Sequence, residues 1–212
     1  MPARFAPGVQ AQIDGAIRAL RRGGIVAYPT DTVYGLGASM NIPRSVRRVF
    51  EVKSRPANMA LPLLVADMSQ IEALAREVRP VARTLIDSFM PGALTLVMPA
   101  SRAVPEIVTA GGSTVALRIP DHPVPIALIR GTGVPLVGTS ANVSGLPSPL
   151  TAAGVRSQLG DRVDIVIDDG SSCPGTESTV VDVSGDIPVV LRQGAISMEG
   201  LRRVCGTILS GS

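Results

Sequence analysis

The chain has 212 residues, of which 45% are hydrophobic and 17% are charged, and its formal net charge is +3. This composition supplies ample apolar material for a core, which excludes intrinsic disorder as a description of the whole chain. No apolar run approaches the roughly 18 residues of a membrane-spanning helix, and the N-terminus lacks the hydrophobic segment of a signal peptide. We therefore expect a cytoplasmic protein with no membrane partner.

Hydrophobic periodicity predicts helices and strands that alternate along the chain. In chain order, the expected elements are a helix at 9–20, a strand at 25–28, a helix at 43–51, a strand at 61–65, helices at 71–76 and 81–89, strands at 94–98 and 114–119, a helix at 124–130, a strand at 136–139, a helix at 152–159, strands at 165–167, 179–183 and 189–191, and a helix at 198–204. We predict a single α/β (α+β) domain over 1–212, with its core at about 9–205 and a mixed sheet of six or more strands.

The candidate metal ligands do not form a recognisable motif. Cys173 and Cys205 match no zinc or redox spacing, so we expect two reduced thiols. His122 is the single histidine and cannot form a histidine-based metal site alone, and the neighbouring carboxylates of Asp168 and Asp169 are expected to face water. We predict no metal site formed by the chain itself.

Hydroxyl groups concentrate in the segment PTDTVYGLG at 29–37, directly after the first expected strand. Such a glycine-bounded turn can present short, rigid donors to a small polar ligand. Alternatively, its hydroxyls satisfy the backbone of the turn itself. The spacing alone leaves both interpretations open.

Lys53 is the single lysine among 20 cationic residues and stands in the segment KSRP at 53–56. Pro56 disfavours helical geometry at Arg55, so both cations can project to one side of a segment that has left the helix. Two convergent cations suit a polyphosphate. The alternative is that they complement the C-terminal end of the preceding helix dipole.

Polar groups also follow three later strands. The segment GTSANVSG at 138–145 offers hydroxyls, an amide and backbone N–H groups that suit phosphate or ribose oxygens, although it matches neither a Walker A loop nor GxGxxG. Arg118 and Arg192 end apolar strands and need an acidic partner, such as Asp182, or a phosphate. A site rich in cations and hydroxyls but poor in nucleophiles favours chemistry by positioning and electrostatics.

Seven segments, taken together and in this order, resemble the L-threonylcarbamoyladenylate synthases, the Sua5/YrdC/YwlC family, from about residue 23 to 194. They are PTDTVYGL (29–36), KxRP (53–56), PG with Thr95 (91–95), VALRIP followed by HP (115–123), SANxSG (140–145), ESTVVD (177–182) and LRQG (191–194). The length resembles the short, single-domain form of the family.

This resemblance implies a YrdC-like fold, a twisted open sheet flanked by helices with a concave, positively charged cavity. It implies a nucleotidyltransferase that joins L-threonine, bicarbonate (or CO2) and ATP into threonylcarbamoyl-AMP and pyrophosphate. Partner proteins would use this product for the t6A modification at adenosine 37 of tRNAs that read ANN codons, and Mg2+ is expected with ATP.

The resemblance also implies roles for individual residues. Lys53 and Arg55 would contact the ATP phosphates and act in catalysis. The other ATP-binding positions would be Thr114, Ser140, Asn142, Ser148 and Arg192, and the threonine-binding positions would be Thr32, Arg118, Gly138 and Ser178. Met59 and Leu64 stand where some members carry Asn and His, so no ligand contact is carried over from that strand.

Two alternatives stay open. One is a module that binds tRNA or double-stranded RNA without catalysis, for which binding would depend steeply on salt and not on threonine. The other is a family relative with divergent carbamoyl-adenylate chemistry. The carbamoyltransferases of hydrogenase maturation share the domain type, but their zinc-finger and acylphosphatase-like segments do not occur in this sequence.

Overall fold

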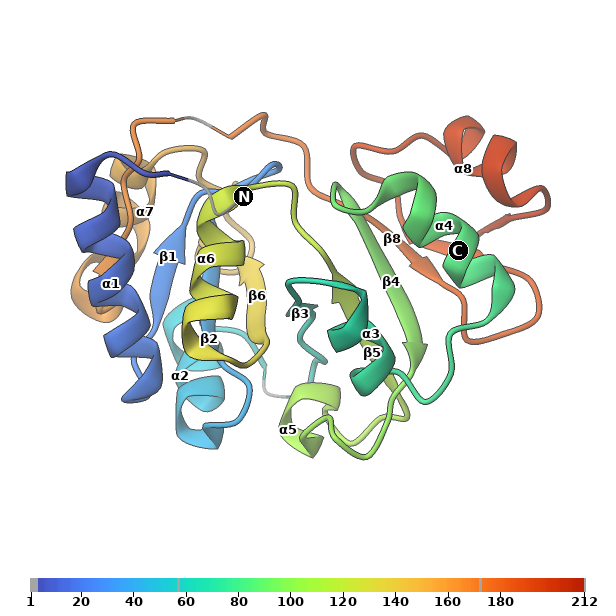
Figure 1. Ribbon diagram of the computed structural model, residues 1–212, viewed down its shortest axis with the longest axis horizontal. Helices are drawn as coiled ribbons and strands as arrows, with labels where there is room; N and C mark the ends of the chain where they lie inside the picture. The colour runs from blue at the N-terminus through green and yellow to red at the C-terminus, as the bar shows by residue number, and fades with distance from the viewer. Residues whose placement is uncertain (1–3, 57, 172, 212) are drawn as a thin grey trace.

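A ten-stranded mixed sheet runs through the computed structural model, which describes residues 4–56, 58–171 and 173–211 (Figure 1). The strand order is β10-β9-β8-β4-β5-β3-β6-β2-β1-β7. The strands are β1 (Val26–Tyr28), β2 (Gly35–Ser39), β3 (Leu63–Leu64), β4 (Leu94–Pro99), β5 (Thr114–Arg118), β6 (Leu136–Ser140), β7 (Ile165–Val166), β8 (Thr179–Asp182), β9 (Val189–Arg192) and β10 (Leu209–Ser210). Because β10 and β7 end the order on opposite sides, the sheet is open, and the predicted α/β fold is confirmed.

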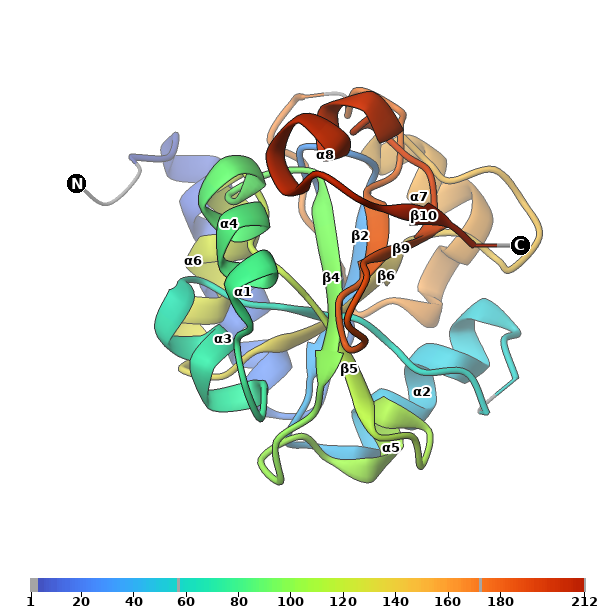
Figure 2. The same cartoon turned by 90° about the vertical axis from the view of Figure 1, so that its right-hand side faces the viewer.

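Helices cover both sides of the sheet. They are α1 (Pro7–Arg21), α2 (Pro43–Lys53), α3 (Met68–Leu74), α4 (Pro80–Phe89), α5 (Glu106–Thr109), α6 (Pro123–Thr132), α7 (Ala152–Leu159) and α8 (Met198–Cys205), with a short 3-10 helix at Gly160–Arg162. Figure 2 shows α3, α4 and α6 on one side of β4, and α2 and α7 on the other. No helix in the described ranges is long and apolar enough to cross a membrane.

Strand alternation divides the residues of the sheet between core and cavity. In β5, Val115 and Leu117 are buried in the main hydrophobic cluster, whereas Ala116 and Arg118 face a cavity. In β4, Leu96 is likewise in the core, whereas its neighbours Thr95 and Val97 line the cavity. Because successive side chains of a strand point to opposite faces, the same apolar runs that build the core also place polar groups at fixed positions in the cavity.

The expected helices are all present, with ends that differ by a few residues. The expected strand at 61–65 pairs only over Leu63–Leu64, while β2, β10 and α5 were not predicted.

β2 pairs with β1 and with β6, although its segment indicated only a turn. The glycines in β2 interrupt the alternation of apolar and polar side chains by which a strand is recognised in a sequence. Glycine is needed at these positions because the buried Tyr28 ring fills the space that a side chain would occupy. A Cβ on Gly35 would lie 2.8 Å from Tyr28 Cε2, and one on Gly37 would lie 2.7 Å from Tyr28 Cε1.

The Gly37→Ala substitution should therefore destabilise the protein by about 1–3 kcal/mol, because the added methyl overpacks a fully buried site. The measurement is the midpoint of urea-induced unfolding, which should fall while the m value stays unchanged. Gly8→Ala is the matched control, since nothing lies within 4 Å of a Cβ at this position of α1. Equal stability of the two variants would contradict the packing described here.

Candidate functional site

A cavity of about 580 Å³ opens on the sheet between β2 and β8. Its floor comes from alternate residues of the strands, among them Thr95, Ala116 and Gly138. Leu64 also lies on the floor, and its side chain covers Gly138 so closely that a Cβ there would be 2.5 Å from Leu64 Cγ. The volume lies in the range usual for sites that take small molecules.

Lys53 connects the end of α2 to the loop that follows β6. Its Nζ donates to the backbone oxygens of Ser140 and Asn142, the latter at 2.9 Å, and to Asn142 Oδ1 at 3.0 Å. Helix α2 ends there because Ser54 adopts a left-handed conformation with φ of 51°. Lys53 therefore bonds to a second segment of the chain and does not complement the end of its own helix.

Burial, and to a smaller extent the positive charge of Arg55, lower the pKa of Lys53 to about 8, whereas Glu177 acts in the opposite direction. Burial also lowers the pKa of the Arg55 guanidinium. Arg55 Nη2 donates to the backbone oxygen of Ala60 at 3.2 Å, while its buried Nε has no hydrogen-bond partner among the described residues. Lys53 and Arg55 thus converge on the same end of the cavity, as predicted from their segment.

Asn142 organises the loop that receives Lys53. Its Oδ1 accepts from the hydroxyl of Ser140, and its Nδ2 donates to the backbone oxygens of Val143 at 3.0 Å and Leu146 at 2.7 Å. Ser140 and Asn142 both line the cavity. Most hydrogen-bonding groups of the Asn142 side chain are therefore satisfied within the loop, and these bonds hold the loop in one conformation.

Arg118 lies buried at the other end of the floor and is held by three oxygens. Its nitrogens donate to Asp31 Oδ1 at 2.6 Å, Thr32 Oγ1 at 3.0 Å and the backbone oxygen of Gly92 at 2.9 Å. The acidic partner is therefore Asp31, and not Asp182, whose Oδ1 accepts from Ser184.

Of the two interpretations of the segment at 29–37, satisfaction of its own turn is observed at Thr30, and ligand binding stays a prediction for Thr32. Thr30 Oγ1 donates to the backbone oxygen of Val33 at 2.8 Å and so satisfies the turn itself. Thr32 instead lines the cavity and accepts from Arg118.

Arg192 reaches the same region from the end of β9. It pairs with Glu177 and donates through Nη2 to the backbone oxygen of Ser178 at 2.9 Å and to Ser178 Oγ at 3.2 Å. Ser178 Oγ lies 2.9 Å from Thr95 Oγ1, and Ser148 Oγ donates to Glu177 Oε1 at 2.8 Å. Glu177 and Thr95 were not among the predicted site residues, although both stand in segments that carry the resemblance.

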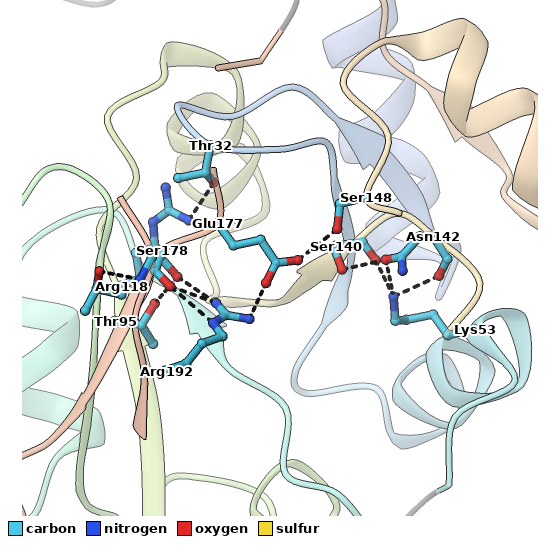
Figure 3. Close-up of polar contacts among 12 residues, drawn as sticks. Thr32, Lys53, Thr95, Arg118, Ser140, Asn142, Ser148, Glu177, Ser178 and Arg192 are labelled. Carbon is cyan, nitrogen blue, oxygen red and sulfur yellow. Dashed lines mark hydrogen bonds and ion pairs between the residues drawn. The ribbon is translucent and has the colours of Figure 1, made fainter. Parts of the chain in front are cut away.

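Figure 3 shows two polar groups, with Glu177 between them. One surrounds Lys53 and the other surrounds Arg118 and Arg192. Four cationic side chains line the cavity, but Asp31 pairs with Arg118 and Glu177 pairs with Arg192. Within the described ranges, Lys53 and Arg55 form no ion pair with a carboxylate, so the uncompensated positive charge lies at their end.

All predicted site residues line the cavity except Thr114 and Ser148. Ser148 is joined to the site through Glu177. Thr114 begins β5 opposite Pro99 and shares the face of Ala116, but lies outside the cavity lining.

The remaining candidate ligands serve the fold. His122 Nδ1 accepts from the Val124 backbone at the start of α6, and its Nε2 lies 3.6 Å from Asp169 Oδ2. Burial lowers the pKa of His122. Asp168 is exposed, as predicted, and lies 3.5 Å from Arg156, whereas the Asp169 carboxylate is largely covered and does not simply face water. Both cysteines are free, as expected, and the described residues contain no group of three or more histidine, cysteine or carboxylate side chains suited to a metal.

Comparison with known proteins supports the resemblance on which these residues were chosen. The model of the Sua5/YciO/YrdC family, described as "Telomere recombination", matches residues 18–194. A protein of Bacillus subtilis named threonylcarbamoyl-AMP synthase is 45% identical over 198 residues, which are 93% of this chain and 57% of that protein. This chain thus spans little more than half the length of that relative.

Solved structures agree with this relationship. The structure of Pyrococcus abyssi Sua5 complexed with L-threonine superposes with a TM-score of 0.92 at 39% identity, covering 99% of this chain and 61% of that one. Escherichia coli YciO superposes with a TM-score of 0.83 at 26% identity, covering 93% and 95% of the two chains. Since the family model spans most of the chain and these structures share its fold, the chain belongs to the Sua5/YciO/YrdC family.

Proposed function

We propose that this protein forms threonylcarbamoyl-AMP and pyrophosphate from L-threonine, bicarbonate or CO2, and ATP. The observation that supports this most directly is the division of charge in the cavity. One end presents two cations without a carboxylate partner among the described residues. The other end presents the buried guanidinium of Arg118, which Asp31, Thr32 and Gly92 hold in place. The proposal also agrees with the name of the Bacillus relative, threonylcarbamoyl-AMP synthase, and with the L-threonine bound in the Pyrococcus structure.

Threonine is placed at the Arg118 end. A guanidinium matches a carboxylate with two parallel hydrogen bonds, and Arg118 is held rigidly by Asp31 and Gly92. The hydroxyls of Thr32 and Ser178 line the same cavity, as does Gly138 on its floor. These four positions would bind the carboxylate and the side-chain hydroxyl of threonine.

ATP is placed along the Lys53 end. The threonine nitrogen bonds to the carbon of CO2 and loses a proton, which gives a carbamate. A carbamate oxygen then attacks the α-phosphorus, and the bond to the bridging oxygen breaks as pyrophosphate leaves. Lys53 and Arg55 would offset the charge that develops on the phosphate oxygens, so no nucleophile from the protein is needed.

The remaining nucleotide contacts are assigned on the same basis. Ser140 and Asn142 line the cavity beside Lys53, and Ser148 and Arg192 meet at Glu177. Thr114 would be reached only by the part of the nucleotide that extends beyond the cavity lining.

We also propose that Mg2+ enters with ATP. Mg2+ in such sites is held by one or two carboxylates together with substrate phosphates and water. Glu177 is the carboxylate of the described cavity lining, and it is already engaged by Arg192 and Ser148. Phosphate oxygens and water would therefore supply most of the ligands.

Proteins that modify tRNA at adenosine 37 would consume the adenylate.

The first experiment is pyrophosphate release by the purified protein with ATP and bicarbonate, with and without L-threonine, followed by mass analysis of the nucleotide. We expect release that depends on threonine and a product with the mass of threonylcarbamoyl-AMP. Binding of ATP without release would exclude this reaction for the chain alone. Absence of ATP binding would favour the RNA-binding alternative, which steeply salt-dependent RNA affinity would then support.

The Lys53→Ala substitution should lower kcat/KM for adenylate formation by about 10²–10³, the usual effect of removing one preorganised charge. Because the pKa of Lys53 is near 8, ATP affinity of the unmodified protein should weaken as the pH rises through that value. Calorimetry at several pH values should show this loss in the unmodified protein only. Lys53→Met, which keeps the length of the side chain, is the matched variant. A pH dependence that persists in both variants would assign it to another group.

The Arg118→Lys substitution should raise KM for threonine by about ten- to hundredfold, because the charge-assisted fork is lost, and leave ATP affinity within about twofold. Thr32→Val removes the neighbouring hydroxyl without altering the Arg118–Asp31 pair and should act in the same direction. Weaker ATP binding with unchanged KM for threonine would reverse the two ends of the cavity.

A further inference from the structure

Glu177 stands on a segment that contributes Glu177 and Ser178 to the cavity lining. Residues 173–178 lie between β7 and β8 and pass from one half of the molecule to the other (Figure 1). The backbone N–H of Cys173 donates to Leu150, and that of Gly175 donates to Thr32, at 3.0 and 2.9 Å. The segment is thus tied to the loop that follows β6 and to the turn that carries Thr32.

The backbone of Glu177 is also fixed from the side of β9. Its carbonyl accepts from Ala195 at 2.9 Å, and a Cβ on Gly194 would lie only 2.2 Å from the same oxygen. This close approach requires glycine at position 194. Because the backbone is held on both sides, the part of Glu177 that can move is its side chain.

The Glu177 carboxylate has the surroundings of a bound anion. Ser148 Oγ donates to Oε1 at 2.8 Å, and Arg192 Nη1 donates to Oε2. Its charge also acts on Lys53 across the cavity and opposes the lowering of the Lys53 pKa that burial and Arg55 cause. Arginine binds carboxylate and phosphate through the same planar arrangement of N–H donors, so the donors that hold this carboxylate are equally suited to a phosphate group.

We propose that the Glu177 side chain competes with a phosphate group of the nucleotide for Ser148 and Arg192, and that it moves aside when the polyphosphate binds. This inference rests on the proposed use of ATP. It makes Glu177 a positioning residue, which acts through Arg192 and Ser148.

The contacts of Glu177 and Arg192 favour exchange of Glu177 for a ligand phosphate over a permanent ion pair. The side chains of Arg192 and Glu177 are 48% and 36% exposed, and ion pairs at this exposure contribute little to stability. Arg192 keeps its bonds to Ser178 when Glu177 leaves, so its guanidinium stays in place. A carboxylate that remained between Ser148 and Arg192 would instead repel the negative charges of a triphosphate.

The test is the affinity of Glu177→Gln for inorganic tripolyphosphate and for ATP, measured by calorimetry without threonine, at fixed ionic strength, with and without Mg2+. Glutamine keeps the size of the side chain and removes its charge. We expect at least about threefold tighter binding than in the unmodified protein in both Mg2+ conditions, since the competing state is depopulated. Glu177→Ala should act in the same direction, and circular dichroism checks that both variants are folded.

Glu51→Gln is the matched control, because Glu51 is exposed on α2 near Lys53 but does not line the cavity. An equal gain in this control would show long-range electrostatics and overturn the proposal. Unchanged, weaker or undetectable binding by Glu177→Gln would also overturn it, and a loss confined to Mg2+ would assign the carboxylate to the metal. Tighter binding without threonine-dependent pyrophosphate release would support the competition and contradict only the proposed reaction.

Discussion

The buried ammonium of Lys53 needs oxygen partners, and this requirement organises one end of the cavity. A cation of this kind is tolerated in a protein interior only when hydrogen bonds replace its water. Lys53 obtains them from Ser140 and Asn142, on a loop that lies far from α2 in the sequence. The end of a helix and the end of a strand are thereby held together. The same burial lowers the pKa of Lys53 to about 8, so the group that shapes the site is also sensitive to pH.

Charge pairing then decides how the two ends of the cavity differ. Asp31 compensates the charge of Arg118, and Glu177 compensates the charge of Arg192. Lys53 and Arg55 contact backbone and amide oxygens in the described part of the chain, and their full charges face the cavity. A substrate pair with one amino-acid carboxylate and one polyphosphate matches this division.

The two compensating carboxylates are not equivalent. Asp31 lies behind Arg118, is largely buried, and does not line the cavity. Glu177 lies within the lining, is partly exposed, and belongs to the segment at 173–178 that passes from one half of the molecule to the other (Figure 1). A buried pair positions its arginine permanently, whereas an exposed pair can exchange partners. This difference in burial is the physical basis for treating Asp31 as structural and Glu177 as a competitor for ligand.

The sequence by itself determined every α-helix except the short α5, most strands, the α/β class and the segments that meet in the cavity, because these follow from local periodicity and from short motifs. It did not reveal β2, whose glycines make room for Tyr28 and show no alternation. Nor did it identify the partners of the cations: Arg118 was expected to meet a residue such as Asp182, and Glu177 was not singled out. Those partners depend on the strand order, which places β8 beside β4 and β6 beside β2. Side chains more than 80 residues apart thus come into contact, and only the tertiary structure decides such pairs, since long-range packing sets them.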